Sequence, residues 1–221
     1  SDRWKFFVAF APGIILTTLL YMALNAYRDF RDNFAVEIWN ALGYEQTPSI
    51  MTYSEIPIAI LVLVMSALMI YVKRNRTAFY INFLIMIAGG AVVLITTQLF
   101  KLEAFHPAAW MIAVGFGMYV AYMFYHTVLF ERWIALFRVK SNIGFLMYFC
   151  DSFGYLASVG VLLYKNFILR DMSWLNFFIK ISYWMGISAI GLGVLALIYF
   201  IWKEKRTLVS MAPKPLETDS F

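Results

Sequence analysis

Charged residues are scarce in this sequence, and their scarcity excludes most classes of soluble protein. Asp, Glu, Lys and Arg make up 14% of the 221 residues, whereas 62% of the residues are hydrophobic. A soluble domain has roughly 25% charged residues and about 45–50% apolar ones. The excess of apolar residues is too large for a water-exposed surface. It therefore excludes a soluble enzyme, a nucleic-acid-binding domain and a disordered chain.

Residue types that carry redox, metal or hydrolytic chemistry are also few. The single cysteine, Cys150, permits no internal disulfide, and two histidines are too few for a bis-His electron carrier. The sequence contains no Walker motif, no His-x-x-x-His, no Cys-x-x-Cys and no Gly-x-Ser-x-Gly. We therefore expect no cofactor, no metal site and no enzymatic activity.

Long apolar runs dominate what is present. A helix that crosses a bilayer needs about 20 mostly apolar residues. Apolar runs of this kind recur along the chain, one of them broken only by Asp151, and prolines at 48 and 107 mark two helix starts. The sequence predicts an all-α polytopic membrane protein in which residues 1–205 form one domain and 206–221 a disordered cytoplasmic tail. The six predicted transmembrane helices are 6–27, 48–72, 77–100, 107–130, 142–164 and 176–202.

Basic residues gather on one side of these predicted spans. With the N-terminus inside, the inner segments hold twelve Lys and Arg residues and the outer segments hold six. Positive charge is enriched in cytoplasmic loops, so we expect both termini in the cytoplasm. Because the basic residues lie between apolar blocks, the pI of 9.2 indicates membrane topology and no nucleic-acid partner.

Residues 28–42 differ from the other connecting segments. Phe30, Phe34, Ile38 and Leu42 recur every four residues, charged residues fill the other faces, and Gly43 follows. This pattern predicts an amphipathic helix that either prolongs the first span or bends into the outer interface. Its charges, which include Arg28, Arg31 and Asp32, form ion pairs on a solvated face, or one of the two arginines faces a cavity and binds an anion.

Ionisable side chains inside predicted spans are costly and are therefore candidates for function. Asp151 lies roughly 13 Å along the fifth span, near the membrane centre, and Tyr155 extends a polar stripe on the same helix. Asp151 either serves function or pairs structurally with a neighbouring helix. His126 either relays protons or is a packed neutral histidine bonded to a tyrosine. Glu55 is positioned to meet Arg28 or Arg31.

Two further patterns concern gating and packing. Glu131 and Arg132 end the fourth span and resemble an ion pair at the inner face, which makes them candidates for a gate.

Small residues predict close helix contacts, and packing is the favoured interpretation for each group. These groups are Gly89-Gly90, Gly115-x-Gly117, Gly154-x-x-x-Ser158 and Ala189-x-x-x-Gly193.

Six helices with both ends inside and a basic loop at 73–76 resemble one half of a major facilitator superfamily transporter. The loop lacks the glycine and aspartate of that superfamily's motif, and the missing initial Met favours the C-terminal half. The segments ALNAYRDFRDNFAVEIW, Tyr53–Pro57 and ERWIALFRVKSNIGFLMYFCDSFGYL resemble an uncharacterised bacterial family of such proteins over about residues 5–205. This resemblance implies a bacterial cell inner membrane, a lipid bilayer environment, and an N-terminal six-helix half or a second copy as partner.

The end of the first span also resembles, more distantly, the corresponding segment of the organophosphate:phosphate antiporters. In that family an arginine of the equivalent helix binds phosphate, and Arg28 is the nearest match, although it lies roughly 16 Å beyond the middle of the 6–27 run. The resemblance implies a secondary transporter, or its C-terminal half, that moves a small polar or anionic solute by alternating access. A non-transporting membrane subunit, and a membrane enzyme whose catalytic residues lie on another portion, are the alternatives.

Overall fold

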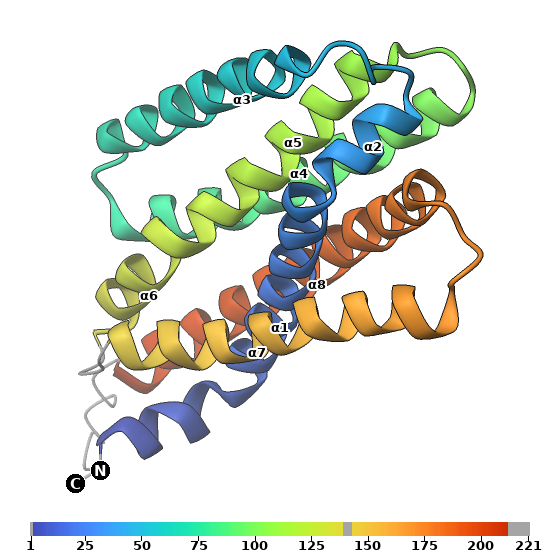
Figure 1. Ribbon diagram of the computed structural model, residues 1–221. Helices are drawn as coiled ribbons and strands as arrows, with labels where there is room; N and C mark the ends of the chain where they lie inside the picture. The colour runs from blue at the N-terminus through green and yellow to red at the C-terminus, as the bar shows by residue number, and fades with distance from the viewer. Residues whose placement is uncertain (1, 139–142, 212–221) are drawn as a thin grey trace, which may run out of the picture.

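The computed structural model describes residues 2–138 and 143–211, and every regular element in these ranges is helical (Figure 1). Three elements are single short turns, of which η2 and η3 are π-helical. In chain order the elements are α1 (Asp2–Asn33), α2 (Ala35–Ala41), α3 (Ser49–Leu68), η1 (Met69–Tyr71), α4 (Asn75–Lys101), α5 (Pro107–Phe124), η2 (Tyr125–Leu129), α6 (Phe130–Phe137), α7 (Ile143–Leu163), η3 (Tyr164–Ile168) and α8 (Trp174–Met211).

Six helical stretches in the described chain are long and apolar enough to cross a membrane, which confirms the predicted fold class. They are Trp4–Asn33, Ser49–Tyr71, Asn75–Lys101, Pro107–Phe137, Ile143–Ile168 and Trp174–Leu208. Pro107 is the first residue of α5, as predicted, because proline needs no hydrogen bond for its nitrogen at that position. Helix α3 begins one residue after Pro48.

Helix α8 extends beyond the predicted span and continues through residues 206–211, which the sequence assigns to the tail. Glu204 explains part of this extension, because it is buried and tied to α4 by Arg76 at 2.8 Å and by the hydroxyl of Tyr80 at 2.5 Å. No proline interrupts the helix before Pro213. The rest of the predicted tail lies outside the described residues.

Helix α4 is the centre of the bundle. It packs against α5 on one side and α8 on the other, while α1 packs against α7 and α8, and α3 lies along α5 at the edge (Figure 1). A Cβ on Gly89 would collide with the backbone of Gly117 in α5, and one on Gly90 would lie 2.6 Å from the Cβ of Ala189 in α8. The predicted small-residue contacts are therefore real packing surfaces.

An aromatic core fills the end of the bundle where α1 begins and α8 nears its end. The ring of Trp133 lies edge-on to Phe200 with centroids 4.6 Å apart, and both are buried. Such edge-to-face pairs are favoured by the quadrupoles of the rings. We call this group the aromatic core; its members are Phe10, Phe79, Phe83, Trp133, Phe137 and Phe200.

The predicted amphipathic segment is divided between two helices, and the first alternative, a prolonged first span, holds up to Asn33. Helix α1 continues to Asn33, so the first span is prolonged, and the chain then bends at Phe34 into the short helix α2. Phe30 and Ile38 of the predicted apolar stripe are buried. Gly43 follows with a φ of +91°, a left-handed conformation that glycine adopts without strain. The bend leaves the last two turns of α1 inside the bundle, where they carry the charged residues described next.

Candidate functional site

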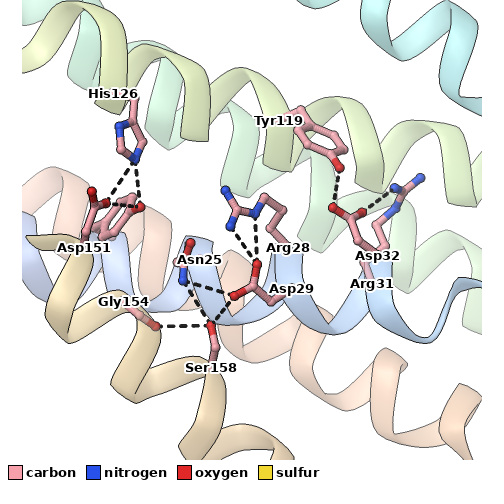
Figure 2. Close-up of polar contacts among 11 residues, drawn as sticks. Asn25, Arg28, Asp29, Arg31, Asp32, Tyr119, His126, Asp151, Gly154 and Ser158 are labelled. Atoms are coloured by element: carbon pink, nitrogen blue, oxygen red, sulfur yellow. Dashed lines mark hydrogen bonds and ion pairs between the residues drawn. The ribbon is translucent and has the colours of Figure 1, made fainter.

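Polar side chains follow one face of α1 over its C-terminal half and meet partners from α3, from α5 with η2, and from α7; Figure 2 shows the contacts with α5, η2 and α7. Their spacing of three to four residues places most of them on one side of the helix. We call this set the polar ladder. Its α1 members are Tyr21, Asn25, Arg28, Asp29, Arg31 and Asp32, and their partners are Glu55 of α3, Tyr119 and Tyr122 of α5, His126 of η2, and Asp151 and Ser158 of α7.

The innermost rung joins Tyr21, His126 and Asp151. The hydroxyl of Tyr21 donates to Oδ1 of Asp151 at 2.7 Å and lies 2.7 Å from Nε2 of His126. A phenol carries a single proton, so Nε2 of His126 must hold its own hydrogen and donate it to the tyrosine oxygen. Nε2 is also 3.5 Å from the Asp151 carboxylate. Asp151 thus lies against protein groups, as the cost of a charge in lipid predicts.

The middle rung is centred on Asp29. Its Oδ2 accepts a hydrogen bond from Ser158 at 2.7 Å and one from Asn25 at 3.3 Å, while its Oδ1 receives Nε and Nη2 of Arg28 at 3.1 and 2.7 Å. The guanidinium of Arg28 lies over the ring of Tyr122, 4.2 Å from its centroid. Nη1 of Arg28 takes no part in the two hydrogen bonds to Asp29 (Figure 2).

The contact with Tyr122 places Arg28 against α5. Tyr122 is the central residue of the span Pro107–Phe137, and the guanidinium of Arg28 lies over its ring. Arg28 belongs to α1, which continues to Asn33, six residues past the predicted end of the first span.

The outer rung is built around Arg31, whose side chain is 3% exposed. Nη2 donates to Glu55 Oε1 at 2.7 Å and to the carbonyl of Met111 at 3.3 Å, and Nη1 lies 3.5 Å from Asp32. Asp32 in turn accepts from the hydroxyl of Tyr119 at 2.6 Å. The pairing of Arg31 with Glu55 is one of the two that the sequence predicted.

Gly115 makes room for this rung. A Cβ at that position would lie 2.7 Å from Nη2 of Arg31, so only glycine lets the guanidinium approach α5 this closely. The predicted Gly115-x-Gly117 packing group therefore has two roles. Gly117 receives a neighbouring helix, and Gly115 receives a charged side chain.

The ladder is open at its edges. The side chains of Asp32, Glu55 and Asp151 are 42%, 46% and 32% exposed, which leaves their carboxylates within reach of a further molecule. Glu55 and Tyr119 also line a groove of about 640 Å³ between α3 and α5. Figure 1 shows α3 and α7 at opposite edges of the bundle, with α1 and α5 between them.

Charge in the ladder is mixed rather than positive. With His126 neutral, the cations are Arg28 and Arg31 and the anions are Asp29, Asp32, Glu55 and Asp151. The difference of two positive and four negative charges is a formal −2. Both arginines already bind carboxylates. The ladder therefore offers both cationic and anionic groups, with an excess of negative charge.

Six of the predicted site residues meet in the ladder, and three do not. Tyr155 lies one turn along α7 from Asp151, but its side chain is 65% exposed and makes no hydrogen bond within the described chain. Arg132 donates to Asn75 at 2.7 Å, and no ion pair joins it to Glu131 among the described residues. The Arg132 side chain is directed to the start of α4 instead of to its neighbour in the sequence.

Several ladder residues escaped the sequence reasoning. Tyr21, Asn25 and Asp29 recur at intervals of four, and this polar period inside an apolar run was the signal that would have found them. Ser158 was assigned to packing alone, yet it is buried and bonds both Asn25 and Asp29. Its hydroxyl is what connects α7 to the middle rung.

Comparison with known proteins adds a family but no activity. No curated protein and no solved structure matches the chain. One family model, described as a family of unknown function (DUF5690), matches residues 1–203. This range contains the start of all six spans and every residue of the polar ladder. The chain therefore belongs to the family of unknown function DUF5690.

Proposed function

We propose that the chain is a secondary transporter, or one six-helix half of such a transporter, and that the polar ladder binds its solute. The observation that carries this proposal is the concentration of six charged side chains along one face of an otherwise apolar bundle. Charges at membrane depth are costly, face a protein interior or a water-filled cavity, and mark solute or ion pathways.

Small zwitterions are the solute class that the ladder chemistry favours. A carboxylate of the solute would bind the guanidinium of Arg28 through Nη1, which does not contact Asp29, and an ammonium group would bind Asp32 or Glu55. A dianionic phosphate would meet a ladder of formal charge −2, so the phosphate binding implied by the antiporter resemblance has less support. Arginine binds carboxylate well because its planar donors match two oxygens.

The innermost rung supplies a place for a coupling proton. Nε2 of His126 and Oδ1 of Asp151 are 3.5 Å apart and both contact the Tyr21 hydroxyl. Protonation of either group changes the charge of the rung by one without breaking the packing around it. Alternating access would then proceed by movement of α1 relative to α5 and α7, as the resemblance to the major facilitator superfamily implies.

Uptake into liposomes tests the proposal. The full chain is reconstituted, its mass is measured in detergent, and entry of a radiolabelled amino acid mixture is compared with entry of glycerol 3-phosphate under an inward proton gradient. We expect amino acid uptake above protein-free liposomes, a loss of it in Arg28→Gln, and normal uptake in Arg170→Gln, whose side chain is exposed and lies outside the ladder. Uptake of glycerol 3-phosphate that depends on Arg28 would show that the solute is a phosphate ester and not a zwitterion.

A non-transporting subunit is the alternative that one observation favours. Helices α3 and α7 are the least buried of the six spans, and the side chains of Asp32, Glu55 and Asp151 are all part-exposed. A second half, a second copy or another membrane protein would cover these groups better than lipid. Absence of uptake for every solute, together with a stable complex by mass, would favour this alternative over transport.

A further inference from the structure

A groove separate from the polar ladder runs between α7 and α8, with α1 as its floor. Its volume is about 550 Å³. Small residues create the space: Ala23 and Ala26 on α1, and Ala157 and Gly160 on α7. A Cβ added to Gly160 would meet no atom within 4 Å, so this glycine faces open space rather than a neighbouring helix. The groove therefore has room for a slender apolar chain.

The length of the groove matches one leaflet of a bilayer. Its α8 wall begins at Phe177 and ends at Ser188, along a single face of the helix. Eleven residues of helix rise roughly 16 Å, which is about half of a hydrocarbon core ~30 Å thick. An acyl chain that enters from the membrane surface would fill the groove from one leaflet to the bilayer centre.

Lys180 marks the surface end of the groove. It lines this groove and also a second cavity of about 710 Å³, whose wall includes Lys101, Asp171 and Asn176. Lys180 is the seventh residue of its span, roughly 9 Å from the helix start, and it forms no ion pair in the part of the chain that the structure describes. Lysine at such a depth places its stem in lipid and its ammonium among headgroups.

We infer that the groove binds one acyl chain of a membrane phospholipid, with the lipid phosphate between Lys180 and Lys101. Two ammonium groups face one carboxylate, that of Asp171, at this end, so the second cavity has a net positive lining. That sign selects a phosphate-bearing lipid over a neutral lipid with the same chains. The inference does not depend on the proposed transport activity, because no ladder residue lines either cavity.

Two substitutions test the two halves of this site. Gly160→Leu fills the groove, and Lys180→Gln removes the phosphate partner. Matched controls are Gly191→Leu, at a glycine of α8 that likewise has open space around it, and Lys205→Gln, at an exposed lysine near the other end of α8. Circular dichroism establishes that all four variants keep the helix content of the wild type.

Native mass spectrometry measures the lipid bound to each protein, both the lipid that co-purifies and the lipid that is added. The added probes are dioleoylphosphatidylethanolamine and dioleoylglycerol. We expect the phospholipid to bind the wild type and both controls, and to bind Gly160→Leu and Lys180→Gln roughly tenfold more weakly, the effect of losing one charge-assisted contact. Dioleoylglycerol should bind weakly to every protein. Equal phospholipid binding by Gly160→Leu and the wild type, or equal binding of the two probes, would overturn the inference.

Discussion

The aromatic core and the polar ladder stabilise the same bundle by different means. In the aromatic core, rings from α1, α4, α6 and α8 are buried and meet edge to face, and close glycine contacts hold α4 against its neighbours. In the ladder, α1 meets α3, α5 and α7 largely through hydrogen bonds and ion pairs whose acidic members are part-exposed.

This difference separates a fixed scaffold from an adaptable face. Interlocked rings and glycine contacts have one good geometry, because displacement by an ångström loses the packing. Paired charges can exchange one partner for another at little cost while both remain solvated or bonded. We therefore expect substitutions in the aromatic core to change stability most, and substitutions in the ladder to change function more than stability.

The largest stability effect is expected for Phe200→Ala in the aromatic core. Phe200 contacts rings of Phe79, Phe83 and Trp133, and truncation of a buried aromatic typically costs about 3–5 kcal/mol. Unfolding in detergent or bicelles measures the loss. Phe167→Ala is the control, because that ring is 65% exposed and should cost under about 1 kcal/mol. If the two variants lose similar free energies of unfolding, the aromatic core does not contribute more to stability than the exposed rings do.

A smaller effect is expected for the Arg31–Glu55 pair. A double-mutant cycle with Arg31→Gln and Glu55→Gln should give a coupling of about 1–2 kcal/mol, because the arginine is buried and the glutamate half-exposed. The same cycle with Glu37→Gln, an exposed residue outside the ladder, should give a coupling near zero. If the two cycles give the same coupling energy, Arg31 is not stabilised by Glu55 in particular, and the outer rung does not connect α1 to α3.

The smallest stability effect, with the largest functional one, is expected for Tyr21→Phe. Loss of the hydroxyl removes two hydrogen bonds of the innermost rung and should lower the free energy of unfolding by about 1 kcal/mol. Proton-driven uptake should fall much further. Tyr183→Phe, which removes a contact with Gln98 outside the ladder, should leave uptake unchanged. A stability loss as large as that of Phe200→Ala would show that the ladder also acts as scaffold.

The fold was predictable because its causes are local. Apolar runs and the proline at 107 mark the spans, and small residues mark the close contacts of α4. The pairing of Arg31 with Glu55 was one of two that the sequence predicted, since Arg31 lies near the end of its span and Glu55 near the start of the next. The spans and most of the charged ladder residues thus follow from composition and spacing, whereas Asp29 did not.

Other parts of the site depend on tertiary geometry that composition does not reveal. Tyr21 is one of 14 tyrosines in an aromatic-rich chain, and nothing in its local sequence marks it as the bridge between His126 and Asp151. Arg132 was matched to the adjacent Glu131, but its partner is Asn75 on another helix. The end of α1 at Asn33 was missed because charged residues interrupt the apolar run at residue 28.

The π-helical turn η2 decides which environment each half of its span meets. Six aromatic or histidine residues of this span are spaced so that an uninterrupted α-helix would align them along one stripe. They are Tyr119, Tyr122 and His126 before or within η2, and Phe130, Trp133 and Phe137 after it. The extra residue in η2 turns everything after it by roughly 100°, so Tyr119, Tyr122 and His126 face the polar ladder of α1 while Trp133 and Phe137 pack in the aromatic core. A single-residue deletion within 125–129 would therefore force both sets to compete for the same side of the helix.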